Sequence, residues 1–273
     1  MAAPAFSATL VTFRTPAPML RKALESLARA IEGARAAGAL SEAHVHVVDN
    51  SPAHAGAEIA SVVRTWPGEA GAIALHAGHG NVGYGRANNL VLPLLRSEIH
   101  LVMNPDIELS PDALLEASRA LQAQPEIGLI APSVVGADGE RQYLCRRYPS
   151  LRVLFLRGFA PGALRERHRR LIDEYEMRDA LGNAQAEVPL ASGCFMVVRT
   201  ALLARLGGFD PRYFMYFEDY DLSLRIGREA RVAYLPSAQV VHLGGDAARK
   251  GVRHVAWFLA SAWRFFSRHG WKL

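Results

Sequence analysis

The sequence has few cysteines and no long run of apolar residues. Its two cysteines, Cys145 and Cys194, lack paired-cysteine spacing, which argues against a disulfide framework or a structural zinc site and suits a reducing cytoplasm. The apolar runs fall well short of the about 18 residues that a membrane-spanning helix needs. The first residues also lack the basic stretch and apolar core of a signal peptide. We therefore expect a cytoplasmic protein, soluble or peripheral to a membrane.

Acidic residues are outnumbered, with 26 Asp and Glu against 31 Lys and Arg, which gives a formal net charge of +5 over 273 residues. The basic residues gather in 141–170 and again in 249–272. Such clusters suit anionic lipid, a phosphorylated acceptor or nucleic acid, although a solvated basic surface would show the same pattern.

Short apolar runs alternate with helical patterns in the first half of the chain. This alternation predicts an α/β fold, with a mostly parallel sheet flanked by helices and ligands bound beyond the carboxyl ends of the strands. Strands are expected at 6–13, 44–51, 71–78 and 98–110, helices at 17–38, 57–66 and 111–124, and a glycine-rich turn that enters a helix at 78–95.

The second half is less regular. Residues 146–187 are basic and interrupted by Pro and Gly, and we expect them to form a mobile insertion with one or two helices. A strand and helix at 188–210, strands at 231–245 and a last helix from 247 to 269 follow. The expected division is one domain over 1–246 and a carboxyl-terminal amphipathic helix over 247–273.

Three acids crowd behind aromatic residues in "YFMYFEDYDLSLR", namely Glu218, Asp219 and Asp221. An apolar, like-charged setting raises the pKa of a carboxyl group and suits it to general-base chemistry. The alternative is structural, because Asp219 or Asp221 could cap the helix that begins here.

Polar residues also follow two apolar strands. Asp49 and Asn50 in "VVDNS" could accept hydrogen bonds from a ribose or a base, or could simply form a turn. In "LVMNPDIEL", Asn104 ends a strand, and Asp106 could hold a divalent cation that bridges a diphosphate or could belong to a turn.

The stretch "GHGNVGYGRANN" combines glycines with amides at the entry to a helix. Gly83 and Gly85 permit close approach of the backbone, and Asn81 and Asn88 could bind a polar ligand or cap the helix. The stretch matches neither the Walker A loop nor the spacing of the dinucleotide fingerprint.

The order of these motifs carries a resemblance. "VTF", "VVDNS", "GNVGYGRANN", "NPD", "ASGCFMVVR", "GGFDPRYFMYFEDYDLSLR" and "VVH", over Ala8 to Gly245, together resemble the family 2 inverting glycosyltransferases of the Rossmann-like GT-A fold, most closely the rhamnosyltransferase-like members. The resemblance implies that 1–246 is a catalytic domain and that 146–187 lies on its acceptor side.

The resemblance also implies roles for single residues. The catalytic base is expected to be Asp219, beside Glu218, while Asp221 caps the helix and Arg225 orients the acids. Asp106 and His242 are expected to hold Mg²⁺ or Mn²⁺, although Asn104 stands where the family has a first acid. The expected nucleotide-sugar-binding residues are Thr12, Asp49, Asn81, Gly83, Gly85, Asn88 and Asn104.

The implied reaction transfers L-rhamnose from dTDP-L-rhamnose to a hydroxyl of a saccharide or lipid-linked saccharide in cell-surface polysaccharide synthesis, with inversion at the anomeric carbon. A UDP-hexose donor is the nearest alternative. A nucleotidyltransferase or a catalytically silent nucleotide-sugar-binding protein is a more distant one. No nucleic-acid partner is expected.

The last helix has a basic face and an apolar face. Arg249, Arg253, Arg264 and Arg268 share a narrow face with Trp257, and Val252, Val255, Leu259, Ala262, Trp263 and Phe266 lie opposite. The apolar face could dock on the catalytic domain. Alternatively, the helix could lie on an anionic membrane, as a peripheral contact at the inner face of the plasma membrane.

Overall fold

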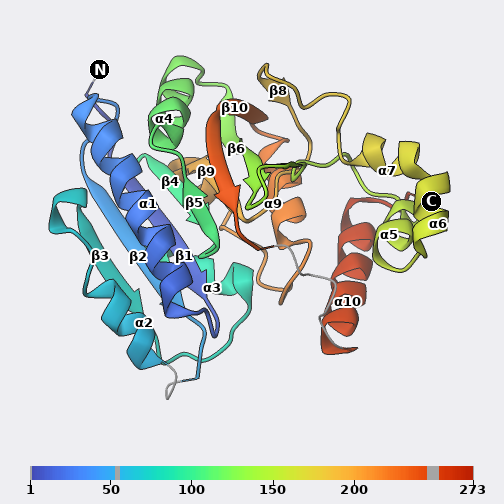
Figure 1. Cartoon of the computed structure of the whole chain (residues 1–273), viewed down its shortest axis with the longest axis horizontal. Helices are drawn as coiled ribbons and strands as arrows, with labels where there is room; N and C mark the ends of the chain where they lie inside the picture. The colour runs from blue at the N-terminus through green and yellow to red at the C-terminus, as the bar shows by residue number, and fades with distance from the viewer. Residues whose placement is uncertain (1, 53–55, 245–251, 273) are drawn as a thin grey trace.

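The computed structural model describes residues 2–52, 56–244 and 252–272, and its centre is a ten-stranded sheet (Figure 1). The strand order is β3-β2-β1-β4-β9-β6-β10-β5, with β7 paired to β6 and β8 to β10. The strands are β1 (Phe6–Thr12), β2 (Ala43–Asp49), β3 (Ala72–His76), β4 (Ile99–Met103), β5 (Ile107–Leu109), β6 (Ile127–Gly136), β7 (Arg141–Gln142), β8 (Ala186–Glu187), β9 (Phe195–Arg199) and β10 (Arg231–His242).

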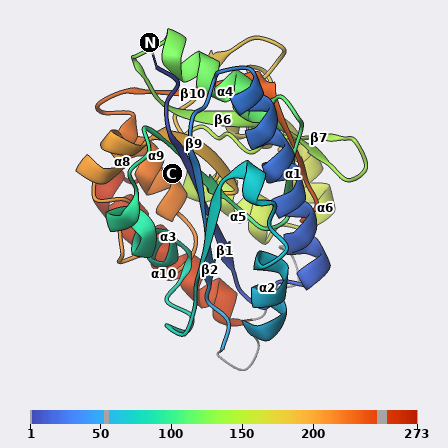
Figure 2. The same ribbon diagram turned by 90° about the vertical axis from the view of Figure 1, so that its left-hand side faces the viewer.

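Helices cover both faces of the sheet. Figure 2 shows α1 and α2 on one side of β1 and β2, with α3, α8 and α9 on the other. The α-helices are α1 (Ala17–Ala36), α2 (Gly56–Val63), α3 (Tyr84–Val91), α4 (Ala113–Ala123), α5 (Leu151–Gly158), α6 (Gly162–Arg167), α7 (Arg169–Tyr175), α8 (Thr200–Arg205), α9 (Glu218–Ile226) and α10 (Val252–His269). Two buried apolar layers, one on each face of the sheet, form the main core.

The sheet is parallel where the sequence alternates most regularly. Strands β3, β2, β1 and β4 pair in parallel, as do β6 and β10. The α/β class is therefore confirmed, but β9 runs antiparallel between β4 and β6 and makes the sheet mixed. The apolar run in β9 suits a strand buried on both faces in either direction, so its composition does not specify its direction.

This reversal decides where the chain places its functional loops. Because β9 is antiparallel to β4, its first residue Phe195 lies opposite Met103, the last residue of β4. Thr12 and Asp49, at the ends of β1 and β2, are likewise paired in register. The segment before β9 therefore lies at the same edge of the sheet as the carboxyl ends of the parallel strands.

Three expectations about single elements were wrong in detail. Residues 98–110 form two strands, β4 and β5, because Asn104 to Asp106 turn the chain. The segment expected to form several strands at 231–245 has one long strand, β10, whose register shifts between Leu235 and Gln239; residue 245 lies outside the described residues. The 146–187 segment contains three helices, α5, α6 and α7.

The predicted faces of the last helix also need correction. Ala262 and Phe266 are buried as expected, but Val255, Leu259 and Trp263 are 38%, 56% and 67% exposed. The inward face is instead centred on Phe265, which is fully buried against Phe217 and Tyr220 of the acid-cluster region.

Two of the four arginines that were predicted to share a face opposite the apolar residues contact the domain. Arg264 donates to the carbonyl of Arg212, and Arg268 pairs with the buried carboxylates of Asp210 and Asp221. These acids rotate the helix away from its simple apolar orientation, because a buried carboxylate needs a charged partner. Arg249 and the expected start of the helix lie outside the described residues.

None of the described helices is long and apolar enough to cross a bilayer. Figure 1 shows α10 beside α5, beyond the end of the sheet that carries β10. This end contains an aromatic cluster built from α9, α10 and the segments around them.

Candidate active site

The carboxyl ends of β1 and β2 form a buried polar corner. The Thr12 hydroxyl donates to Oδ1 of Asp49 at 3.0 Å, and the Ser51 amide donates to the same oxygen at 3.0 Å. Both Thr12 and Asp49 are almost completely buried. A carboxylate held in this way keeps a fixed orientation at the sheet edge where nucleotides bind in α/β folds.

This corner is tied to the glycine-rich turn. The Asn50 side chain donates to the carbonyl of Gly83 at 3.3 Å, and its Oδ1 lies 3.0 Å from Nε2 of His79. Asn81 accepts from the amide of Gly83 at 3.0 Å. The turn is therefore positioned by its own Asn81 and His79 and by Asn50, which follows β2.

Position 83 requires glycine for two reasons, its backbone conformation and the close approach of Phe214. It precedes α3 with φ +91°, and a Cβ there would collide with the carbonyl oxygen of Phe214. The amide of Tyr84 donates to that same carbonyl at 3.1 Å. A Cβ on Gly85 would also approach Phe209 to 2.9 Å. The glycines thus let the turn pack directly on the segment that precedes the acid cluster.

The acid cluster begins α9 after an unusual turn. Tyr216 and Phe217 both have left-handed backbone conformations, with φ of 70° and 64°. Consecutive non-glycine residues in this region are strained, and such strain gathers at functional sites. The turn presents Glu218 and Asp219 at the first residues of the helix.

Asp219 is held by two backbone amides. Gly193 donates to Oδ2 and Tyr220 to Oδ1, each at 2.9 Å. Burial raises the pKa of Asp219 above its usual range, and these amides oppose the shift. Burial and the neighbouring Asp219 raise the pKa of Glu218 to about 8. Oε2 of Glu218 is buried and has no hydrogen-bond partner within the described chain. The pair is therefore arranged to divide one charge between two carboxyls.

Asp221 does not cap the helix. The N-cap position is Phe217, and the Asp221 carboxylate accepts from Arg225 at 2.7 Å and from His269 at 2.8 Å. The expectation that Asp221 is a cap was wrong, because three basic side chains, including Arg268, surround this fully buried group. Arg225 does contact an acid of the cluster, as expected.

The segment before β9 joins the separate motifs. The Tyr84 hydroxyl donates to the carbonyl of Gly193 at 2.6 Å, while the amide of Gly193 reaches Asp219. The next carbonyl, that of Cys194, accepts from the amide of Asn104 at 2.8 Å. A Cβ on Gly193 would lie 3.2 Å from Asp219. Two consecutive residues, Gly193 and Cys194, therefore connect the glycine-rich turn, the "NPD" turn and the acid cluster.

Asp106 and His242 come together at the end of this edge. Oδ2 of Asp106 lies 3.5 Å from Nε2 of His242, and Oδ1 of Asp106 is buried without a partner in the part of the chain that the structure describes. Nδ1 of His242 lies 2.8 Å from Oε1 of Gln142, which can only accept, so Nδ1 donates there, and in the neutral imidazole the lone pair is on Nε2.

Asp106 and neutral His242 can together hold a hard divalent cation. A carboxylate oxygen and an imidazole lone pair face one another, and a cation between them would satisfy both. Within residues 2–52, 56–244 and 252–272, no cluster of three or more His, Cys, Asp or Glu side chains is placed to hold a metal ion. A bound ion would therefore depend on ligands from a substrate, as is usual for Mg²⁺ bound to phosphates.

The structure brings most of the predicted residues to this edge, and it adds four that the sequence did not single out. His79, Tyr84 and Gly193 lie inside quoted motifs, whereas Gln142 stands in a segment with no distinctive pattern. Asn88 donates to the carbonyl of Tyr84 at 3.1 Å, and its Oδ1 is buried and unsatisfied by any described residue.

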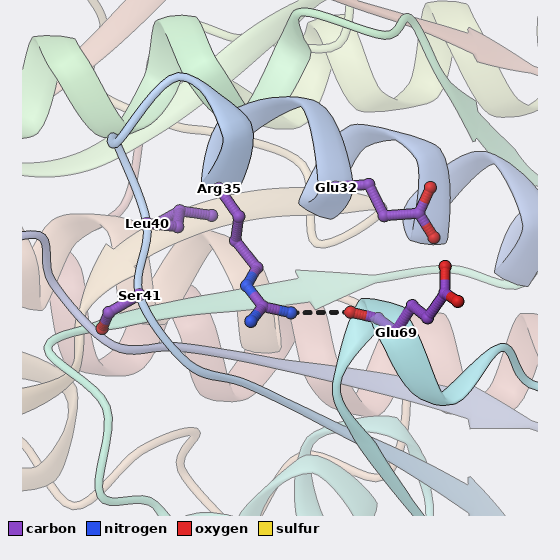
Figure 3. Close-up of a pocket in the computed structure, with 5 residues that line it drawn as sticks. All are labelled: Glu32, Arg35, Leu40, Ser41 and Glu69. Atoms are coloured by element: carbon purple, nitrogen blue, oxygen red, sulfur yellow. Dashed lines mark hydrogen bonds between the residues drawn. The ribbon is translucent and has the colours of Figure 1, made fainter.

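A separate surface hollow has no part in this site. It is lined by Glu32, Arg35, Leu40, Ser41 and Glu69, and Arg35 donates to the carbonyl of Glu69 at 2.7 Å (Figure 3). Ser41 precedes β2 and Glu69 precedes β3, so the hollow lies at the amino ends of these strands.

A family model described as "Glycosyltransferase like family 2" matches residues 4–259. The chain belongs to this glycosyltransferase family. A curated relative, N-acetylglucosaminyl-diphospho-decaprenol L-rhamnosyltransferase of Mycobacterium tuberculosis, is 32% identical over 210 residues, which are 70% of this chain and 66% of the relative. The rhamnosyltransferase WbbL of Escherichia coli K12 is 26% identical over 199 residues, covering 69% of this glycosyltransferase and 72% of WbbL.

Solved structures agree on the fold of this glycosyltransferase. The mannosyltransferase PcManGT of Pyrobaculum calidifontis, in complex with GDP-Man and Mn²⁺, has a TM-score of 0.58 at 18% identity, over 90% of this chain and 58% of that one. S. aureus TarS residues 1–349, with UDP-GlcNAc, has a TM-score of 0.56 at 15% identity, over 90% and 61%. The expected GT-A fold is thereby confirmed.

Proposed function

We propose that this glycosyltransferase moves L-rhamnose from dTDP-L-rhamnose to a hydroxyl of a lipid-linked saccharide in cell-surface polysaccharide synthesis, with inversion. One observation carries the proposal. The carboxylate of Asp219 is held by two backbone amides, at the place where the glycine-rich turn and the "NPD" turn come together. The names of the two curated relatives support the sugar, and the first of them supports a lipid-linked acceptor.

The donor would bind along the strand ends. Asp49 would accept hydrogen bonds from the nucleoside beside Thr12, and the unsatisfied Oδ1 of Asn88 would accept from the donor inside the turn. The remaining residues that we assign to the nucleotide sugar are Asn81, Gly83, Gly85 and Asn104.

The reaction would be one in-line displacement. Asp219 takes the proton of the acceptor hydroxyl as its oxygen attacks the anomeric carbon, and the bond to the nucleoside diphosphate breaks on the opposite side. Glu218, whose pKa lies near 8, is then protonated at neutral pH and leaves the charge on Asp219. A displacement of this kind needs no covalent sugar intermediate and inverts the configuration.

Asp106 and His242 would hold the divalent cation, Mg²⁺ or Mn²⁺, together with the donor diphosphate. The ion would offset the negative charge that develops on the leaving diphosphate. The facing acceptor atoms of the two side chains support this assignment. Two structural neighbours contain Mn²⁺, which supports the same class of ion.

We also propose that one surface beside the acid cluster lies on an anionic membrane. Two apolar stripes with helical spacing are exposed there, Leu151, Phe155 and Phe159 on and just after α5, and Val255, Leu259 and Trp263 on α10. They meet where Trp271 contacts Trp263 and where the carbonyl of Lys272 accepts from Leu151. Exposed apolar stripes amid basic residues suit the interface of an anionic bilayer.

Sedimentation with lipid vesicles tests this surface. Binding to anionic vesicles is expected at low salt, with weaker binding at high salt and to neutral vesicles. Trp263→Glu should abolish it, and Leu90→Glu, at an exposed apolar residue of α3, should not. Absence of binding to anionic vesicles even at low salt would refute the membrane contact.

The function itself is tested with purified protein, Mg²⁺ or Mn²⁺ and a panel of nucleotide sugars. Donor binding is measured by thermal shift, because a ligand of the native state raises the melting temperature. Transfer is then measured to N-acetylglucosamine diphosphate carried on a short alkyl chain. Product from dTDP-L-rhamnose alone supports the proposal. Product from a UDP-hexose corrects the donor, and donor binding without any transfer would favour a silent binding protein.

A further inference from the structure

Arg146 is a buried arginine close to the acid cluster, and one of its N–H groups has no acceptor among the described residues. Arg146 is 6% exposed, and its Nε has no hydrogen-bond partner among the described residues. One terminal nitrogen donates to the carbonyl of Cys145 at 2.9 Å, and another lies 3.8 Å from Oε1 of Glu176. A buried guanidinium N–H that meets no acceptor costs stability, so its retention points to a ligand.

Arg146 belongs to a group with excess positive charge. Nε of Arg157 lies 3.1 Å from Glu176, and Arg178 pairs with both Glu176 and Asp173. Arg169, which also pairs with Glu166, lies 3.6 Å from Asp173, so three guanidinium groups surround Glu176 and two surround Asp173. Arg178 has two close acidic partners, whereas Arg146 and Arg157 share Glu176, and the charge of Arg146 also acts on Asp219.

A pair of tyrosines connects these arginines to the proposed base. The guanidinium groups of Arg146 and Arg157 lie 5.7 and 5.6 Å from the centre of the Tyr175 ring. The Tyr175 hydroxyl lies 3.1 Å from that of Tyr220, whose amide donates to Asp219. The carboxylate, the tyrosine pair and the arginines are therefore neighbours, and the charge of Arg146 acts directly on Asp219.

Arg157 is on α5, two residues from the half-exposed Phe155 of the apolar stripe, so the two side chains project from opposite sides of the helix. In a lipid diphosphate sugar the phosphate is attached to the sugar ring, so a phosphate held by these arginines would keep the ring near the carboxylate. Arginine side chains recognise phosphate oxygens through charge-assisted, often bidentate hydrogen bonds.

We propose that Arg146 and Arg157 bind the diphosphate of the acceptor, which places its sugar beside the Tyr175–Tyr220 pair and Asp219. This inference rests on the proposed function and extends it, because it names the acceptor as a lipid diphosphate sugar and assigns the residues that recognise the linkage.

The test compares two acceptors that differ only in the diphosphate, an alkyl N-acetylglucosaminyl diphosphate and the matching alkyl N-acetylglucosaminide. The wild-type protein should prefer the first in kcat/KM. Arg157→Met should lower this preference about tenfold or more, the usual worth of a charged hydrogen bond. Arg146→Met should act in the same direction. The control is Arg170→Met, at an exposed arginine of α7, which should keep the wild-type preference.

A direct binding measurement separates this inference from the proposed function. Decyl diphosphate is titrated calorimetrically into each protein without donor, and Arg157→Met should weaken its binding about tenfold. If the protein transfers sugar from none of the donors tested, the proposed function is wrong. The titration still shows whether the arginines bind a diphosphate. Circular dichroism verifies that each variant is folded, and Arg157, which is partly exposed, is the safer change.

Two results would overturn the inference. One is wild-type acceptor preference and wild-type decyl diphosphate binding in the folded Arg157→Met protein. The other is loss of sedimentation with anionic vesicles in this variant while the acceptor preference stays unchanged. The second result would assign the arginines to membrane headgroups in place of the acceptor.

Discussion

Replacing Asp219 with Asn changes charge while it preserves shape. The carboxylate now accepts one hydrogen bond on each oxygen, from Gly193 and from Tyr220. An amide has one acceptor oxygen, so one of the two backbone donors will face an NH₂ group. We expect a loss of about 1–3 kcal/mol in the free energy of unfolding, the usual cost of one buried donor without a partner.

The loss in turnover should be much larger than that structural cost suggests. A positioned general base contributes about 10²- to 10⁴-fold to rate, which is roughly 3–5.5 kcal/mol in the activation barrier. The assay is kcat with saturating donor and acceptor, with donor affinity measured separately by calorimetry. Donor affinity should stay within about threefold of wild type, because the nucleoside is expected at Asp49, at the end of another strand.

Glu218→Gln is the matched control. Because the pKa of Glu218 is raised to about 8, the wild-type side chain is already neutral at pH 7, and Gln should leave turnover within a few-fold. The folded protein then binds a proton at Glu218 that the unfolded chain releases above about pH 4.5. The free energy of unfolding should fall as pH rises from about 4.5 to 8, and Gln should remove this part of the decline.

The two variants together can refute the assignment. Near-normal turnover in folded Asp219→Asn would show that another group accepts the proton. A loss of about 10²-fold or more in Glu218→Gln, with Asp219→Asn nearly active, would move the base to Glu218.

Three further predictions concern other parts of the site. Asp106→Ala should weaken donor binding at least about tenfold with Mg²⁺ or Mn²⁺ but not in chelator, and full activity of the wild type after exhaustive chelation would disprove the metal. Gly83→Ala should lower the free energy of unfolding in urea by about 1–3 kcal/mol, because φ is +91° and Phe214 blocks a Cβ; Gly182→Ala, with open space, is the control and should be nearly neutral. His269→Ala should lower the free energy of unfolding by about 1–3 kcal/mol, since Asp221 loses a buried partner, and an unchanged melting temperature would contradict a stabilising contact between His269 and Asp221.

The sequence predicts the strand-end residues well, because their position follows from local pattern. Thr12 and Asp49 end apolar strands of a parallel unit, and such ends converge at one edge whatever the order of the strands. Gly83 was likewise predictable, because only glycine tolerates its backbone conformation without strain.

Other features depend on contacts between distant segments, and no local pattern specifies them. The direction of β9 follows from its pairing with β4, and Gly193 gains its place from that direction. Gln142 meets His242 across 100 positions of sequence. The rotation of α10 depends on Asp221, which looks like an ordinary first-turn acid until its buried partners are known.

The antiparallel strand β9 also has a consequence for synthesis of the chain on the ribosome. One edge of β4 pairs with β1, and the other waits for β9, which is made roughly 90 residues later, or about 5–20 s at ordinary translation rates. During that interval the strands from β1 to β4 can assemble, with the apolar strand β4 at an unpaired edge. The nascent chain is therefore most prone to aggregation after its nucleotide-binding half has formed and before the segment that completes the acid site emerges.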